Sequence, residues 1–279
     1  MRNLLSAECL RLRKSRLFWL MLLAAAALAV PPFQEELRKA AYSAGTPEGW
    51  AVDEALFQSV MLIGCLFAAF IPLFWGAEYS DGTLRNKLIA GHRRSSVYLS
   101  TLLTSMLTGA AALVLSWGFS GLLAVLTKGR IGMDAGQFAR YLLAGLCCVF
   151  AFASLYVLLS LLIPNRAYAL FGCIAALLAM ILLVGSLQRS LLQAELVSDI
   201  LEFVDGKPVW SEPHPNPFYI SGWKRALFSY FVDFLPAGQS VQMSNLEAER
   251  LARFPALSLL FTLLTTGIGL LAFSRKDIK

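Results

Sequence analysis

The chain has 279 residues, of which 57% are apolar and 15% are charged, and its formal net charge is +6. Soluble domains carry roughly 45–50% apolar and about 25% charged residues, so this composition excludes an ordinary soluble protein. Several apolar runs reach the roughly 20 residues that cross a bilayer as a helix, and the alternating pattern of a barrel is absent. We therefore expect an all-α, polytopic membrane protein with a single transmembrane domain over residues 1–279.

Residues 1–16 form a basic arm ahead of the first apolar run. Leu5, Cys9 and Leu12 recur at helical spacing among several arginines and lysines. This pattern predicts an interfacial helix whose cations lie near anionic lipid of the cytoplasmic leaflet. A plain positive-inside anchor is the alternative. The apolar run that follows has the length of a signal peptide, but the basic region is long, so we expect the run to be kept as the first span.

Six apolar runs are predicted to span the membrane, with polar segments between them. They cover residues 17–33, 56–76, 97–126, 138–163, 167–187 and 254–273. An even number of spans places both termini on one side, and the short basic loops favour the cytoplasm for that side. We therefore expect a multi-pass protein of the cytoplasmic (plasma) membrane, with cytoplasmic termini and membrane lipid around it. Residues 34–54 are predicted to be a solvated loop.

The longest region outside the predicted spans covers residues 188–253. Apolar residues recur there on one face and predict an amphipathic helix, its members being Leu192, Leu196, Ile200 and Phe203. A proline-punctuated loop follows at 205–217. Residues 218–235 are rich in aromatic side chains and also carry charges, which predicts an interfacial or re-entrant segment. A helix packed under the external loop is the alternative.

A short polar insert, EYSDGTLRNKL, separates the second and third predicted spans at residues 78–88. Ser80 and Asp81 are good N-cap residues for a helix that Gly82 opens. Within that helix Leu84 and Leu88 fall on one face, with polar side chains opposite. The pattern predicts an amphipathic helix on the membrane surface, and an ordinary basic cytoplasmic loop is the alternative.

The longer run EYSDGTLRNKLIAGHRR resembles the loop between the second and third spans of ABC exporter permeases with the type V fold, as in bacterial multidrug and peptide exporters. The fit is closest at Glu78, Gly82, Thr83, Arg85, Asn86, Lys87 and Leu88. A weaker likeness is LPAGQ at 235–239, where many relatives carry Thr in place of Ala237. With six spans in the expected places, the resemblance covers nearly the whole chain.

The resemblance implies that this loop is a coupling helix, which docks on an ATPase subunit. It assigns that coupling to Glu78, Asp81, Gly82, Thr83, Arg85, Asn86 and Lys87. It implies as partners two ABC ATPase subunits, which hold ATP and Mg, and a second permease subunit, identical or related. It also implies external re-entrant helices that cap the pathway, and we assign an external gate to Phe231, Phe234, Pro236, Gly238 and Gln239.

The sequence disfavours other functional classes. No GxxxxGK[S/T] phosphate loop is present, so we expect a chain that is not itself an enzyme and binds no cofactor. The five cysteines and two histidines show no metal-ligand spacing, and we expect neither a metal nor a nucleic-acid partner. Spans two to six carry essentially no ionisable residues away from their ends, which disfavours ion-coupled transport, ion-selective pores and membrane catalysis.

We therefore expect the permease subunit of an ATP-driven exporter, moving a hydrophobic or amphipathic cargo such as a peptide, drug or lipid-like molecule by alternating access. Phe67, Phe70 and Phe74 recur on one face of the second span, as pathway lining or as ordinary helix packing. The alternative function is a non-transporting membrane sensor, immunity protein or assembly partner with the same fold.

Overall fold

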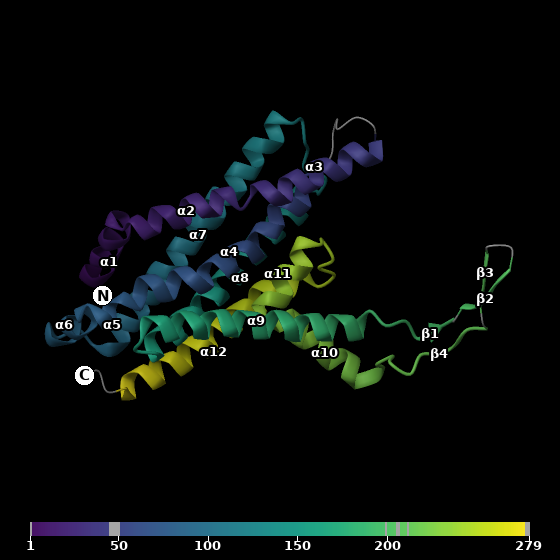
Figure 1. Ribbon diagram of the computed structural model, residues 1–279. Coiled ribbons are helices and arrows are strands. Elements are labelled where there is room, and N and C mark those ends of the chain that lie inside the picture. Colours follow the sequence, from purple (N-terminus) through teal and green to yellow (C-terminus); the bar gives the residue numbers. More distant parts are fainter. Residues whose placement is uncertain (1, 45–50, 199, 205–206, 211, 277–279) are drawn as a thin grey trace.

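The computed structural model describes residues 2–276 apart from 45–50, 199, 205–206 and 211, and most of it is a bundle of long helices (Figure 1). Six helical segments of the described chain are long and apolar enough to cross a membrane. They are Arg16–Tyr42, Asp53–Tyr79, Arg94–Leu126, Ala135–Leu162, Arg166–Leu191 and Leu251–Arg275. The expected all-α polytopic membrane fold with six spanning helices is therefore confirmed.

The first span is built from two successive helices that follow the N-terminal helix α1 (Arg2–Lys14). Helix α2 (Arg16–Ala27) leads into α3 (Val30–Ala44), which continues well beyond the predicted end of the span. Ion pairs one turn apart, Glu35 with Arg38 at 3.0 Å and Glu36 with Lys39 at 2.5 Å, stabilise this extension. The expectation of a loop from residue 34 is therefore wrong as far as Ala44.

Helices α4 (Asp53–Trp75) and α8 (Ala135–Leu162) form the centre of the bundle. The most apolar stretches of these two spans are 61% and 67% buried, against 22–33% for the other four. Helices α7 (Arg94–Leu126), α9 (Arg166–Leu191) and α12 (Phe254–Arg275) surround them. Movement of α4 or α8 would therefore disturb most of the bundle, whereas the outer helices present wide apolar faces.

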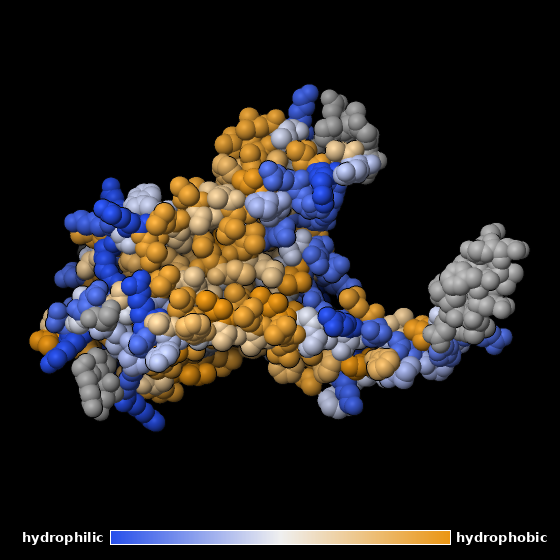
Figure 2. All heavy atoms as spheres, viewed as in Figure 1, coloured by the Kyte–Doolittle hydropathy of each residue, from blue (hydrophilic) through white to orange (hydrophobic). Residues whose placement is uncertain are grey.

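The two ends of the bundle differ in content. The N-terminus, α1, α5 (Ala77–Ser80), α6 (Thr83–Ile89) and the described C-terminal end all lie at one end (Figure 1). Helix α11 (Pro236–Ser244) and the short 3₁₀ helix η1 (Leu251–Arg253) belong to the connection toward the opposite end. Figure 2 shows hydrophilic side chains gathered at the end that carries the termini, beside a broad hydrophobic belt.

Residues after α9 form strands rather than the predicted amphipathic helix. Strand β1 (Leu196–Val197) pairs antiparallel with β4 (His214–Pro215), and β2 (Ile200–Val204) pairs with β3 (Lys207–Trp210). The helix expected from Leu192, Leu196, Ile200 and Phe203 is therefore wrong. Valine and isoleucine in this stretch favour extended backbone, and the Asp-Gly pair between β2 and β3 in the sequence is a hairpin signal. The paired strands extend away from the bundle (Figure 1).

The topology can be tested with single cysteines in a cysteine-free background. We expect His214→Cys to react with a membrane-impermeant maleimide on intact cells, because His214 lies at the end opposite the termini. His92→Cys should react only after permeabilisation, because it follows α6 at the end with the basic loops. Labelling of His92→Cys but not of His214→Cys on intact cells would show that the chain has the opposite orientation in the membrane.

A second prediction concerns the contact of α7 with α12. A Cβ placed on Gly269 would lie 2.1 Å from the hydroxyl of the fully buried Tyr98, which also packs against Phe273. Gly269→Ala should lower the free energy of unfolding by about 1–3 kcal/mol through overpacking, measured by denaturant unfolding in detergent. Gly267→Ala is the control, since nothing lies within 4 Å of its added Cβ. Equal effects of the two substitutions would contradict a tight contact here.

Candidate functional site

The polar insert between α4 and α7 forms two short helices, α5 and α6, joined by a tight turn. Gly82 occupies the N-cap position of α6 with φ of +65°, in the left-handed region that glycine adopts without steric cost. The predicted caps Ser80 and Asp81 instead belong to the end of α5. The left-handed turn at Gly82 explains this correction, because it ends one helix and starts the next.

Helix α6 has a buried face and an exposed face. Leu84 is buried in the core and Leu88 packs against it, as the sequence predicts. Arg85 and Asn86 are exposed on the outer side. Ile89, which the sequence reasoning did not single out, is 72% exposed beside them. The outer face therefore combines a cation, an amide and one large apolar side chain.

Lys87 does not belong to that outer face, although the resemblance grouped it with Arg85 and Asn86. Its side chain is only 17% exposed, and its Nζ lies 2.6 Å from Oε1 of Glu78. It also pairs with Glu8 of α1. The side chain of Lys87 therefore turns inward toward two carboxylates, away from the outer face of Arg85 and Asn86.

Glu8 and Arg11 of α1, Glu78 of α5 and Lys87 of α6 together form a buried cluster of four charges, which we call the ion cluster. Glu78 and Glu8 are 1% and 2% exposed. Arg11 donates to the Glu78 carboxylate and, at 3.0 Å, to the carbonyl of Phe74. Two anions and two cations balance, so the cluster joins α1 to α5 and α6 without net charge.

Because the ion cluster is buried, each of its charges must stay paired to be stable. Desolvation, followed by repulsion from Glu78, raises the pKa of Glu8, while Lys87 and Arg11 oppose that rise. The Arg11 guanidinium also lies over the ring of Phe74, 4.5 Å from its centroid, which adds a cation–π contact. Because a buried charge that loses its partner is costly, the four side chains hold one another in place. Sequence reasoning missed Glu8 because Lys87, its partner in α6, lies 79 residues away in the chain.

A second set of contacts holds α5 from another side. Nζ of Lys276 donates to the hydroxyl of Tyr79 at 2.7 Å and to the carbonyls of Leu161 and Leu162 at 3.0 Å each. These carbonyls belong to the end of α8, where a cation is electrostatically favoured. Burial lowers the pKa of Lys276 to about 8. Adjacent residues of α5, Glu78 and Tyr79, thus contact α1 and α6 on one hand and α8 and the end of α12 on the other.

The residues assigned to an external gate lie along α10 (Gly222–Phe234) and α11, on either side of a sharp turn. Pro236, Gly238 and Gln239 are buried. A Cβ on Gly238 would lie 2.0 Å from the carbonyl of Val232, so only glycine permits this close approach. Gln239 donates to the carbonyl of Asp233 at 2.8 Å and accepts from Ser258 of α12 at 2.6 Å. The turn is therefore fixed within the bundle.

The two aromatic gate residues occupy a different environment. Phe231 is 42% exposed, while Phe234 stacks with Tyr230 at 6.0 Å between ring centroids and meets Phe261 edge-on at 5.5 Å. The structure thus brings the five gate residues to one turn, but it buries three and leaves aromatic rings near the surface of the described chain.

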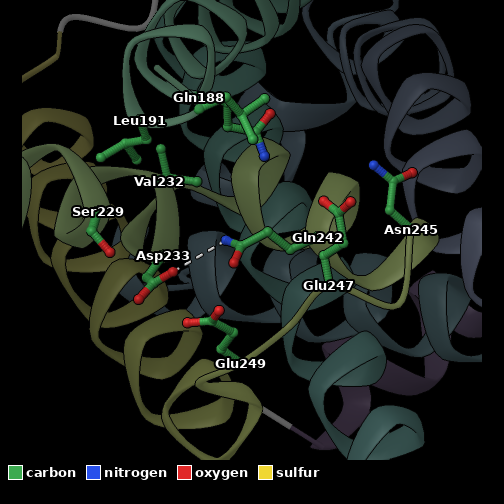
Figure 3. Close-up of a pocket in the computed structure, with 10 residues that line it drawn as sticks. Gln188, Leu191, Ser229, Val232, Asp233, Gln242, Asn245, Glu247 and Glu249 are labelled. Atoms are coloured by element: carbon green, nitrogen blue, oxygen red, sulfur yellow. Dashed lines mark hydrogen bonds between the residues drawn. The ribbon is translucent and has the colours of Figure 1, made fainter. Parts of the chain in front are cut away.

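A cavity of about 450 Å³ lies beside this turn, between α9, α10 and α11. Its polar lining includes Asp233, Gln242, Glu247 and Glu249 (Figure 3). Asp233 accepts from Gln242 Nε2 at 3.1 Å and lies 3.7 Å from Arg250 Nη1, so its charge is already compensated. Among the described residues, no three His, Cys, Asp or Glu side chains are grouped to hold a metal ion.

Phe67, Phe70 and Phe74 form a ladder of rings inside the bundle. Successive centroids are 5.9 and 5.6 Å apart, and all three side chains are buried. Phe67 packs against Gly109 of α7, where an added Cβ would be 3.1 Å from its ring. These are the contacts of ordinary helix packing, so lining of a pathway by these rings requires a movement of α4 that uncovers them.

The ion cluster generates a third prediction. Glu78→Gln keeps the shape of the side chain but leaves Arg11 and Lys87 with Glu8 as their remaining carboxylate. We expect a loss of about 3–5 kcal/mol in the free energy of unfolding and faster hydrogen exchange over residues 83–89 of α6. Arg85→Gln, on the exposed face of the same helix, should change neither. Wild-type exchange in Glu78→Gln would mean that the ion cluster does not hold α6.

Residues 4–186 match the family described as ABC-2 family transporter protein, which is more than half of the chain. The match runs from α1 through most of α9 and so contains the whole ion cluster and α6. It ends before the paired strands, α10, α11 and α12. No curated protein matches the chain.

Proposed function

The chain belongs to the ABC-2 transporter family, and on that premise we propose that it is the permease subunit of an ABC exporter with the type V fold. Members of this family are multi-pass membrane subunits of transporters that work with ABC ATPase subunits and are not ATPases themselves. The observation that carries the finer proposal is α6, a short, firmly held helix with an exposed polar face at one end of the bundle.

We propose that α6 is the helix on which the ATPase docks. A peripheral partner needs an exposed contact whose position relative to the spans is fixed. The outer face of α6 supplies Arg85, Asn86 and Ile89, which are a charge, a hydrogen-bonding amide and an apolar anchor. The buried face and the ion cluster keep this surface in one orientation. The coupling residues Glu78, Thr83 and Lys87 then act from inside, by holding α6 rather than by touching the ATPase.

The contacts of α5 provide a route from the docking helix to the spans. Helix α5 follows α4 after a single residue, and the Gly76 amide donates to the Pro72 carbonyl at 2.9 Å across that junction. Tyr79 of α5 contacts the end of α8 through Leu161. A push on α6 would therefore reach α4 and α8, the two most buried spans. This route supports coupling between α6 and the spans. We propose that it serves alternating access driven by two ATPase subunits, which hold ATP and Mg, with a second permease subunit across the pathway.

The cargo that fits the chain is hydrophobic or amphipathic. The middle portions of α4, α7, α8, α9 and α12 carry no Asp, Glu, Lys, Arg or His, so their pathway faces offer no charge to a polar ion. We propose cytoplasmic termini, which the basic residues around α1 and α6 support. The α10–α11 turn at the opposite end supports an external gate. The plasma membrane is the site we propose.

The docking prediction uses two substitutions on the exposed face of α6. Arg85→Glu combined with Ile89→Ser reverses the charge and removes the apolar anchor without touching the ion cluster. The variant should insert and remain monodisperse but lose at least tenfold of its copurifying ATPase, measured after co-expression with the partner ATPase. A buried charge that loses its pairing costs on the order of 2–5 kcal/mol at an interface.

Arg93→Glu is the matched control, because Arg93 is exposed nearby but lies beyond the end of α6. Arg94 is unsuitable for this purpose, since it donates to the carbonyl of Ser274 at 3.0 Å at the end of α12. Normal ATPase binding and transport in the Arg85/Ile89 variant would exclude α6 as the docking helix. Stable ATPase binding with no cargo that stimulates hydrolysis would favour the non-transporting alternative.

A further inference from the structure

A groove of about 350 Å³ lies between α1, α2 and α7. No residue of the ion cluster lines it. Its walls include Cys9 and Leu12 of α1, Phe18 and Leu22 of α2, and Leu107 and Ala111 of α7. This volume falls within the roughly 300–1,000 Å³ of small-molecule sites. Leu107 is 57% exposed, so the groove is open to the surroundings at this side chain.

The groove offers apolar surface and almost no free hydrogen-bonding capacity. Two threonines of α7 line it, but the Thr104 hydroxyl donates to the Ser100 carbonyl at 2.6 Å and the Thr108 hydroxyl to the Thr104 carbonyl at 2.8 Å. Their hydroxyls are therefore engaged within α7. At about 1.5 Å per residue, Thr104 lies roughly 15 Å along α7 from Arg94. The groove thus extends from the end of the bundle to the depth of the hydrocarbon.

Arg13 lines the mouth of the groove, and Lys14 and Arg16 follow it where α1 turns into α2. Arg13, Lys14 and Arg16 are exposed, and none of them makes a side-chain hydrogen bond or ion pair with another described residue. Trp19, which is 56% exposed, donates its indole N–H to the carbonyl of Arg13 at 2.9 Å. A tryptophan held in this way below unpaired cations is typical of the boundary between headgroups and acyl chains.

We propose that this groove binds an acidic phospholipid of the leaflet on the side of the termini. The phosphate and the anionic headgroup meet Arg13 at the mouth of the groove, while Lys14 and Arg16 add positive charge nearby. One acyl chain lies along Phe18, Leu22 and Leu107. Charge complementarity selects an anionic lipid over a zwitterionic one. A soluble partner does not reach the depth of Ala111. The site is independent of the proposed export function, because it rests on α1, α2 and α7 alone.

The test measures quenching of Trp19 fluorescence by lipids brominated on their acyl chains. The purified full chain is reconstituted in phosphatidylcholine vesicles, and brominated phosphatidylglycerol or brominated phosphatidylcholine is added in increasing proportion. The Trp19 signal is the difference between the wild type and Trp19→Phe. We expect half-maximal quenching at a mole fraction of phosphatidylglycerol at least tenfold below that of phosphatidylcholine, since each cation contributes roughly fivefold.

Two variants separate the headgroup from the acyl chain. The first variant carries Arg13→Gln, Lys14→Gln and Arg16→Gln, and it should lose the tenfold preference for phosphatidylglycerol. The second variant, Ala111→Phe, fills the groove but keeps the cations, and it should reduce quenching. The matched control removes three exposed cations elsewhere at the same end, Arg85, Arg93 and Arg275, and should keep the preference.

Three results would overturn the proposal. Equal quenching by the two lipids would show that the groove holds bulk lipid. An equal loss in the control variant would show that net charge alone attracts the lipid. Cross-linking of Leu107→Cys between two copies in the membrane, with no quenching of Trp19, would show that a second copy of the chain covers the groove.

Discussion

The carboxylate of Glu78 has almost no contact with water. The positions of α1 and α6 at that end of the bundle depend on the pairing of this carboxylate with cations. A buried anion is stable only with partners at hydrogen-bonding distance, and here Arg11 and Lys87 come from two other helices. The same side chain therefore decides where α1 lies and which way α6 faces. Apolar packing alone fixes neither as sharply, because hydrophobic contacts have no preferred direction.

The pairing also gives a physical reason for the outer face of α6. An ammonium group that turns inward, as Lys87 does, leaves Arg85, Asn86 and Ile89 as the surface of the helix. The neighbouring Tyr79 continues the network to α8 and the end of α12 through Lys276. Polar contacts of this kind are short and directional, so together with the packed apolar contacts they transmit displacement between the helices. The ABC-2 family match includes the ion cluster, Tyr79 and the end of α8, whereas Lys276 lies beyond it.

Much of the bundle follows from sequence because apolar runs of bilayer length have few other stable states. The buried face of α6, with Leu84 and Leu88, follows from helical spacing in the same way. The role of Lys87 does not follow from the sequence. Helical spacing predicts which face of α6 carries Lys87, but it does not predict a pairing with Glu8, which lies 79 residues away. The strands after α9 were missed for another reason. Leu192, Leu196, Ile200 and Phe203 fit helical spacing, while Ile200 and the valines of the same stretch favour extended backbone.

The environment of the gate residues likewise follows from the sequence only in part. Gly238 was singled out by a resemblance, and the structure supplies the reason for glycine there, namely the carbonyl of Val232 at its Cβ position. The exposure of Phe231 and the burial of Gln239 depend on how α11 enters the bundle. No local pattern encodes that entry, since it is decided by packing against α4, α8 and α9.

The position of Glu8 and Arg11 near the start of the chain has a consequence for biogenesis. These two residues leave the ribosome 67 or more residues before Glu78 and Lys87. At roughly 5–20 residues per second, several seconds pass before the two halves of the ion cluster meet. During that interval α1 is kept out of the hydrocarbon by its own charges, and it joins the bundle only when the α4–α6 segment has been inserted. Helix α1 is thus fixed in the bundle only after the second span has been made.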